Sequence, residues 1–154
     1  MIRIQSEALA IEPVLAALED DAPAIGAVCS FTGLARDLGD QSGVQSLFLE
    51  HYPGMTETAI QAVVDEAARR WTIHRTEIVH RVGEIRAGER IVFVGVSSRH
   101  RQDAFEACQF IMDYLKTRAP FWKKEITAAG DGDWVEQKAS DREAAQRWAD
   151  SDGL

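Results

Sequence analysis

Hydrophobic positions recur with two different periods along the chain, and these periods predict both helices and strands. Residues 56–71 and 102–118 carry apolar side chains three and four positions apart, which predicts two amphipathic helices. Short apolar or alternating runs before, between and after them predict strands. The expected strands are residues 2–5, 24–31, 44–52, 75–82, 90–98, 121–127 and 134–137.

Shorter elements and turns complete the pattern. Glu12-Pro13 places a proline in the first turn of a short helix that reaches about residue 19, and residues 141–149 predict a last helix. Residues 33–43 contain three glycines and predict a loop, and Gly-Asp-Gly-Asp at 130–133 predicts a turn. Helices and strands are interspersed and hairpins follow, which favours an α+β or mixed α/β fold over a doubly wound parallel sheet.

Composition places the chain among single-domain proteins with a hydrophobic core. It has 154 residues, of which 45% are hydrophobic and 27% charged. We therefore expect one domain over residues 1–154, with the last few residues frayed. The net charge of −8 argues against nucleic-acid binding.

The charge is unevenly distributed along the sequence. Residues 99–124 hold six Lys and Arg against three Asp and Glu, so this window carries +3 and the remainder −11. A basic segment in an acidic protein suggests a small anionic ligand or an anionic chain end. The alternative is that these cations only complement the dipole at a helix C-terminus.

Several classes of function lose support from the sequence. Cys29 and Cys108 form no Cys-x-x-Cys motif and lie in apolar runs, which predicts buried residues in a reducing compartment. The histidines show no metal-ligand spacing, so we expect no metal site. No nucleotide-binding glycine motif or serine-hydrolase motif is present, so functions that use a nucleoside triphosphate, a dinucleotide or a catalytic serine lose support. No leader segment is visible, and the longest apolar run, 91–96, is too short to span a bilayer, so we expect a cytoplasmic protein without membrane contact.

The segment 112–125 is the most informative stretch. Pro120 cannot donate a backbone hydrogen bond and disfavours helical geometry at Ala119, so the second long helix is expected to end near Arg118. Lys116 then lies in the last helical turn, and Lys123 lies on the following strand. The two lysines can therefore point into one cleft, where a desolvated lysine can transfer protons or hold an anion.

Two further groups of cations are candidate anion ligands. Arg99-His100-Arg101 precedes the second long helix, where free backbone N–H groups also favour an anion. Arg36 lies in the glycine-rich loop, which could close over a ligand. The alternatives are that the first group pairs with nearby acids such as Asp103 and that the loop is an ordinary surface loop.

Several blocks of the sequence together resemble the family of large, catalytic subunits of molybdopterin synthase. They run in the family order from about residue 24 to residue 148. The blocks are Ser-Phe-Thr-Gly (30–33) with Arg36, Leu-Glu-His-Tyr-Pro-Gly-Met (49–55), His-Arg-Val-Gly-Glu (80–84), Val-Phe-Val-Gly-Val (92–96), His100-Arg101, Ala-Phe-Glu-Ala (104–107) and the segment 112–125.

The resemblance implies a sulfurtransferase that converts precursor Z, a cyclic pyranopterin monophosphate, into molybdopterin by adding two dithiolene sulfurs. It implies that the sulfur arrives as a thiocarboxylate on the C-terminal Gly-Gly of a small ubiquitin-like partner subunit. It also implies a heterotetramer built on a homodimer of this subunit, an α/β hammerhead-like domain with an added β-rich part, and no metal or organic cofactor.

The resemblance also assigns roles to individual positions. Lys116 and Lys123 match the two functional lysines of the family, the first beside the carbonyl of the partner's tail and the second beside the pterin. The other matched positions, expected to contact or enclose the substrate, are Arg36, His100, Arg101, Phe31, Met112 and Lys138. Lys138 stands where relatives can carry arginine, and a lysine keeps the charge but loses the bidentate geometry.

Two other functions are compatible with parts of the pattern. A non-catalytic module that captures a ubiquitin-like tail would not need Arg36, His100 and Arg101. A phosphoester-handling enzyme that uses His100 as acid or base would turn over without a protein partner.

Overall fold

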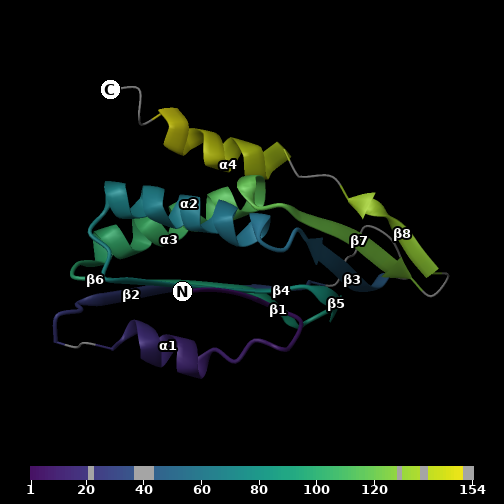
Figure 1. Cartoon of the computed structure of the whole chain (residues 1–154), viewed down its shortest axis with the longest axis horizontal. Helices are drawn as coiled ribbons and strands as arrows, with labels where there is room; N and C mark the ends of the chain where they lie inside the picture. Colours follow the sequence, from purple (N-terminus) through teal and green to yellow (C-terminus); the bar gives the residue numbers. More distant parts are fainter. Residues whose placement is uncertain (21–22, 37–43, 128–129, 136–138, 151–154) are drawn as a thin grey trace.

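A four-stranded sheet lies between two layers of helices in the computed structural model (Figure 1). The structure describes residues 1–20, 23–36, 44–127, 130–135 and 139–150. The helix α1 (Glu12–Leu18) covers one face of the sheet, and α2 (Met55–Arg70) and α3 (Arg101–Arg118) cover the other. The strands, in spatial order, are β1 (Ile2–Gln5), β4 (Arg75–Arg81), β6 (Arg90–Ser98) and β2 (Ala27–Leu34).

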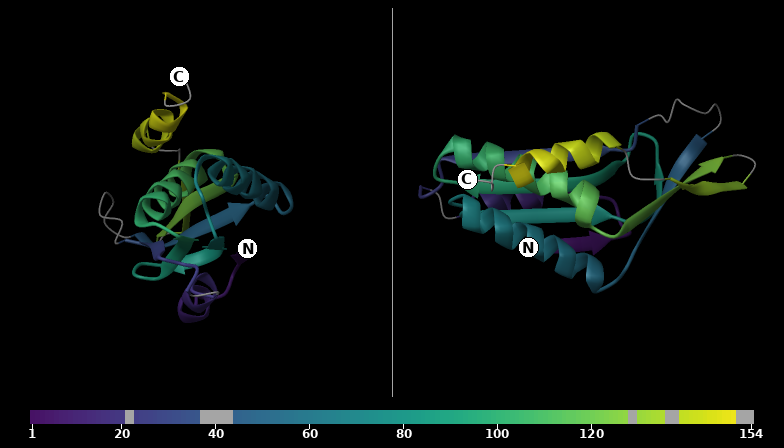
Figure 2. Two further views of the ribbon diagram at one scale, coloured as in Figure 1. Left: turned by 90° about the vertical axis from the view of Figure 1, so that its left-hand side faces the viewer. Right: turned by 90° about the horizontal axis from the view of Figure 1, so that it is seen from above.

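A second sheet projects from one end of this body (Figure 2). In spatial order it contains β5 (Gly83–Arg86), β3 (Val44–His51), β7 (Phe121–Thr127) and β8 (Gly130–Val135), and all its pairs are antiparallel. The last helix, α4 (Ala139–Asp150), runs back over α3 (Figures 1 and 2). The predicted mixed α+β class is therefore confirmed.

Alternation along β4 separates the two sides of the central sheet. Successive side chains of a strand point to opposite faces. Ile78 accordingly packs in the core beneath α2 and α3, whereas Val79 packs with Leu18 of α1 on the other face. His80, the next residue, points to the same side as Ile78, which is the side that carries the cavity described below.

The predicted end of the second long helix is confirmed. Ala119 caps α3 in an extended conformation, with ψ of 131°, and Phe121 already belongs to β7. Pro120 lies between them and prevents the helix from continuing. This break takes the chain directly from the helical layer into the second sheet, so the end of α3 and the start of β7 line the same space.

The largest departures from the predicted strands concern β2, β5 and β8, whereas β3 and β4 each end one residue earlier than expected. β2 begins three residues later than expected and extends into the expected loop, because Thr32, Gly33 and Leu34 continue the pairing with β6. β5 was not predicted, since it has four residues and only Ile85 is buried. β8 begins at Gly130, so the expected turn is part of a strand that pairs with β7, and residues 136 and 137 of the predicted strand lie outside the described residues.

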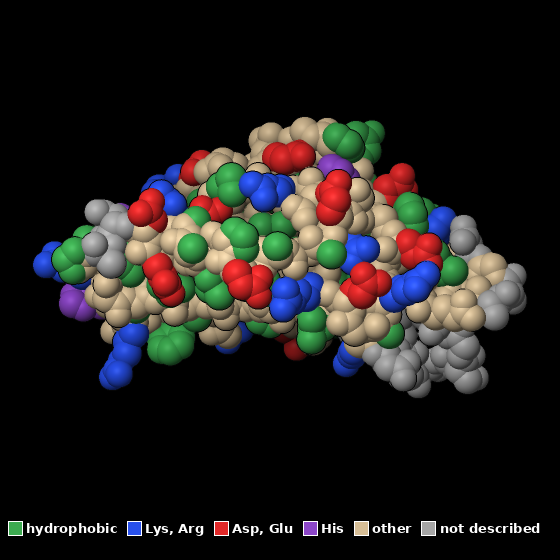
Figure 3. Space-filling model, turned by 90° about the horizontal axis from the view of Figure 1, so that it is seen from below, with side chains coloured by type: hydrophobic (Ala, Val, Ile, Leu, Met, Phe, Trp, Pro, Cys, Tyr) green, Lys and Arg blue, Asp and Glu red, His purple; other side chains and the backbone are tan. Residues whose placement is uncertain are grey.

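The surface shows both charge signs. On the face that carries α1, acidic and basic side chains are interspersed with small apolar areas, without a continuous area of one sign (Figure 3). Within the described ranges, no helix combines the length and apolarity needed to cross a membrane.

Candidate active site

A cavity of about 500 Å³ lies where the two sheets meet the C-terminal end of α3. Its walls come from β2, β3, β4, β6, β7, α3 and the first turn of α4. Leu47, Leu49, Ile91, Val92 and Leu115 make much of the lining apolar. A concave space that combines apolar side chains with a few polar groups is typical of small-molecule sites.

Lys116 and Lys123 both line this cavity, from two different elements. Lys116 extends from the last turn of α3, one helical turn after Met112. Lys123 extends from β7, opposite Leu49 of β3. The sequence-based expectation that the break at Pro120 brings the two lysines to one cleft is confirmed by this geometry.

The neighbouring lysine on β7 points elsewhere. Lys124 lies over the rings of Phe48 and Trp134, at 5.2 Å and 5.1 Å from their centroids. Because side chains alternate along a strand, Lys123 and Lys124 cannot face the same side. Lys124 does not line the cavity and is half-buried like Lys123, so it is a matched control for experiments on Lys123.

Phe31 and Met112 form part of the cavity wall, as the sequence resemblance implied. Phe31 lies on β2 with 42% of its surface exposed, and Met112 is half-buried on α3. A large exposed aromatic beside a cavity mouth can cover a flat ligand or a peptide tail. Their placement is established, and their contacts with a ligand remain predictions.

The cations at the other end of α3 do not join this cavity within one chain. His100 precedes the first turn of α3 and Arg101 begins it, and both are exposed. Arg101 and Lys116 are fifteen positions apart along α3, which corresponds to roughly 22 Å along the helix axis. The basic segment of the sequence is thus divided between the two ends of one helix.

The remaining predicted substrate contacts lie at the limit of the described chain. Arg36 is exposed and follows the buried Ala35, two residues after Leu34 of the cavity wall. Residues 37–43 of the predicted loop lie outside the described residues, as does Lys138.

His80 is a cavity residue that the sequence analysis did not assign to the site. Its ring stacks on Phe121 with centroids 3.9 Å apart and planes inclined by 15°, and its Nδ1 lies 2.8 Å from the carbonyl oxygen of Arg81. Burial, with smaller contributions from Lys116 and His51, lowers the pKa of His80 to about 4. The ring is therefore neutral at pH 7. The sequence block at 80–84 was the only signal that could have indicated it.

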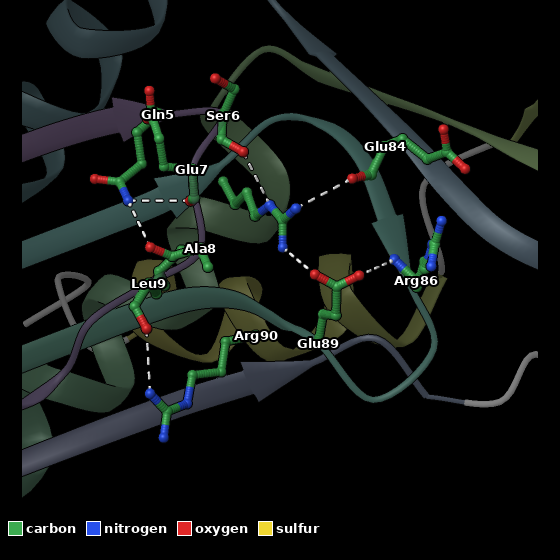
Figure 4. Close-up of polar contacts among 10 residues, drawn as sticks. Gln5, Ser6, Glu7, Ala8, Leu9, Glu84, Arg86, Glu89 and Arg90 are labelled. Carbon is green, nitrogen blue, oxygen red and sulfur yellow. Dashed lines mark hydrogen bonds and ion pairs between the residues drawn. The ribbon is translucent and has the colours of Figure 1, made fainter.

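The residue after His80 is fixed by a polar network. The Arg81 guanidinium donates to the carbonyl oxygens of Ser6 and Glu84, at 3.1 Å and 3.4 Å, and forms an ion pair with Glu89 (Figure 4). The carboxylate of Glu89 also accepts from the backbone N–H of Arg86 at 3.0 Å. These hydrogen bonds, with that from Arg81 the largest, lower the pKa of Glu89. Arg81 thereby joins the ends of β1 and β4 to the β5–β6 turn.

Asp141 is a second cavity residue that the sequence analysis did not assign to the site. It lies in the first turn of α4 and contributes a carboxylate to the cavity that contains Lys116 and Lys123. Nothing in its local sequence distinguishes it from a surface residue at a helix start. Its position depends on how α4 returns over α3.

The two cysteines differ in burial. Cys108 is buried in the core, as predicted, and its thiol lies 3.7 Å from the carbonyl oxygen of Val94. Burial, with a smaller contribution from the neighbouring Cys29, raises the pKa of Cys108 to about 12. Cys29 is only half-buried, because β2 is an edge strand. The part of the chain that the structure describes contains no cluster of three or more His, Cys, Asp or Glu that could hold a metal ion.

Comparison with known proteins gives consistent matches along the chain. The model of the MoaE protein family matches residues 4–118. A curated relative from Pseudomonas aeruginosa, named molybdopterin synthase catalytic subunit, is 55% identical over 147 residues, which cover 96% of this chain and 97% of the relative.

Solved structures match to a similar extent. The molybdopterin biosynthesis MoaE protein of Burkholderia ambifaria superposes with a TM-score of 0.82 at 47% identity and covers 97% of each chain. A chain from the complex of subunits 1 and 2 of the molybdopterin-converting factor of Helicobacter pylori shares the fold, with a TM-score of 0.73 at 21% identity. That match covers 84% of this chain and 87% of the other.

Proposed function

Because this chain belongs to the MoaE family, we propose that the cavity between α3 and β7 is the site at which sulfur is added to a pterin substrate. The chain is an enzyme, the catalytic subunit of a molybdopterin synthase, which converts precursor Z into molybdopterin. The single observation that supports this location is the convergence of Lys116 and Lys123 on one cavity from two elements.

The chemistry of the reaction fits two cations that line one cavity. The attack of a thiocarboxylate on the pterin and the opening of the cyclic phosphate both move negative charge and protons. A lysine held beside the reacting atoms can donate a proton or stabilise developing negative charge. We propose that Lys116 acts beside the carbonyl of the sulfur-carrying tail and that Lys123 acts beside the pterin.

The sulfur donor is proposed to be a small ubiquitin-like subunit with a C-terminal Gly-Gly thiocarboxylate. The Helicobacter pylori protein that shares this fold was solved in a complex of two subunits. Phe31 and Met112 offer an apolar wall along which a glycine tail can extend, and the lysines attract its anionic end. We propose that the enzyme acts in the cytoplasm, because its reducing environment preserves a thiocarboxylate and free cysteines.

The distance between the two ends of α3 bears on how the phosphate is held. A single pterin cannot contact Lys116 and the Arg101 of the same chain, since roughly 22 Å separates them along the helix. We propose that His100 and Arg101 serve the cavity of a second copy in a homodimer, which with two small subunits forms a heterotetramer. Arg36 and Lys138 are proposed to contact the substrate from the chain's own segments.

The direct test mixes the purified protein, precursor Z and thiocarboxylated small subunit and measures dithiolene-containing molybdopterin. Product should require all three components. Lys116→Ala and Lys123→Ala should each lower turnover by at least about 100-fold while tail binding is retained. Lys124→Ala removes a charge from the same strand and should leave turnover within about twofold. Unchanged turnover in the Lys116 variant would contradict its proposed role.

The dimer proposal has its own test. Two inactive variants, Lys116→Ala and Arg101→Ala, are mixed under conditions that exchange subunits. If the site is shared, half of the dimers at equal mixing contain one copy of each variant, and one of the two sites in such a dimer has both Lys116 and Arg101. Activity should then recover to at most about a quarter of the wild-type value. A site confined to one chain predicts no recovery.

A further inference from the structure

His80 is half-buried, and it is the one imidazole in the cavity wall, among the described residues, to which the proposed reaction assigns no role. It lies on β4 between Ile4 of β1 and Val92 of β6, in the middle of hydrogen-bonded strands. Its side chain points to the α3 side of the sheet, as does that of Ile78. The imidazole is therefore held by a strand that is paired on both sides rather than by a loop.

The hydrogen bond of the ring determines which nitrogen carries the proton. Nδ1 lies 2.8 Å from the carbonyl oxygen of Arg81, and a carbonyl can only accept. Nδ1 must therefore donate, which leaves Nε2 of the neutral ring as an acceptor. The acceptor carbonyl is itself fixed, because the Arg81 side chain is tied to Ser6, Glu84 and Glu89 (Figure 4).

The surroundings keep this ring oriented and neutral. Its stacking on Phe121 fixes the ring plane, and Phe121 belongs to the strand that carries Lys123. The charges of Lys116 from α3 and His51 from β3 act on the ring, and Lys123 from β7 and Asp141 from α4 are the other titratable groups that line the cavity. Two of these, Lys116 and His51, add to burial in disfavouring the imidazolium.

We propose that His80 is a positioning residue for Lys116. In this proposal Nε2 of His80 accepts a hydrogen bond from the Lys116 ammonium inside the cavity. The inference rests on the proposed catalytic role of Lys116. A lysine side chain has a flexible four-carbon stem and loses much conformational freedom when it is held in one place. A neutral acceptor can fix the ammonium without adding a second positive charge, and it leaves the cation available to stabilise negative charge in the reaction.

Two substitutions separate the acceptor from the ring. His80→Phe keeps an aromatic ring against Phe121 but removes both nitrogens, whereas His80→Gln supplies an amide oxygen that can accept. If His80 positions Lys116, kcat of the Phe variant should fall by about 10- to 100-fold with little change in the binding of the small subunit. The Gln variant should recover part of this loss.

A second readout does not depend on turnover. Acetylation of Lys116 by acetic anhydride at pH 7.5, quantified on the proteolytic peptide, should be about fivefold faster in His80→Phe, because the ammonium has lost one acceptor. His80→Gln should restore a rate near that of the wild type, and Lys124 acetylation provides an internal reference in every sample. Urea unfolding midpoints ensure that folded proteins are compared.

The outcomes distinguish this inference from the proposed function. Unchanged Lys116 acetylation in folded His80→Phe overturns the positioning role, even if Lys116→Ala is inactive. Faster acetylation together with a fully active Lys116→Ala supports the contact between the two residues and overturns the catalytic role of Lys116 instead. The inference would also be overturned if the Phe and Gln variants lost kcat equally and if Lys116 were acetylated at the same rate in both.

Discussion

The indole Nε1 of Trp148 donates a hydrogen bond of 2.7 Å to the carboxylate of Asp113, and this contact attaches α4 to α3. The Trp148 ring also packs edge-on against Trp71 and Phe110, at 5.5 Å from each centroid. The backbone oxygen of Trp148 accepts from Arg70 of α2 at 3.2 Å. One residue of α4 thus contacts both helices of the layer beneath it, and the same helix brings Asp141 to the cavity.

The first prediction concerns this attachment. Trp148→Ala removes the ring contacts and the hydrogen bond to Asp113, and should lower the free energy of unfolding by about 2–3 kcal/mol. Urea unfolding followed by far-UV circular dichroism measures the change. Arg147→Ala is the control, because its ion pair with Asp113 is half-exposed and should contribute less than about 1 kcal/mol. Equal losses in the two variants would show that the indole does not anchor α4.

The second prediction concerns the reactivity of Cys108. The thiolate is the reactive form of cysteine, and the pKa of Cys108 is raised to about 12 by burial and by Cys29. Iodoacetamide at pH 8 should therefore leave Cys108 unmodified in the native protein and alkylate it once guanidinium chloride unfolds the chain. Peptide mass spectrometry identifies the modified residue. Rapid alkylation of Cys108 without unfolding would show that this part of the core opens readily.

Much of the site could be predicted from local sequence because local rules determine it. Pro120 ends α3 whatever the rest of the chain does, so the lysines on either side of it necessarily belong to two elements that meet. The spacing of apolar residues likewise located α2 and α3 to within a residue or so at each end.

The remaining features depend on contacts between distant segments. β5 has a single buried residue and exists because it pairs with β3. His80 joins the cavity only because Phe121 and Lys116, more than thirty positions later, pack beside it. The cations of residues 99–124 form one segment of the sequence. In the structure the length of α3 separates Arg101 at its start from Lys116 in its last turn.

The third prediction concerns the close approach behind the start of α3. A Cβ added at Gly26 would lie 2.2 Å from the carbonyl oxygen of Arg99, and the Gly26 N–H donates to the Ser98 carbonyl at 3.0 Å. Gly26→Ala should therefore displace the chain that leads into His100 and Arg101 and destabilise the protein by about 1–3 kcal/mol. The thermal midpoint measures this loss.

A control for that substitution is available on the adjoining strand. Ser30 is exposed on β2, so Ser30→Ala should change the free energy of unfolding by less than about 0.5 kcal/mol. If Gly26→Ala were as stable as Ser30→Ala, the segment before α3 would have to accommodate a methyl group without strain. In that case Gly26 would not hold the start of the helix in place.

The fourth prediction concerns stability at acidic pH. The pKa of His80 is about 4 in the folded protein and near 6.5 in an unfolded chain. Between these values the unfolded state binds more protons, so stability should rise with pH across this window and be fully present above it. The difference of about 2.5 units corresponds to a loss on the order of 3 kcal/mol as the pH falls from 7 to below 4. Urea titrations at several pH values measure this loss. Between pH 4.5 and 6, the slope of the free energy of unfolding against pH should correspond to up to one fewer bound proton in His80→Phe than in the wild type. An identical slope in the two proteins would mean that His80 becomes protonated without leaving its place against Phe121.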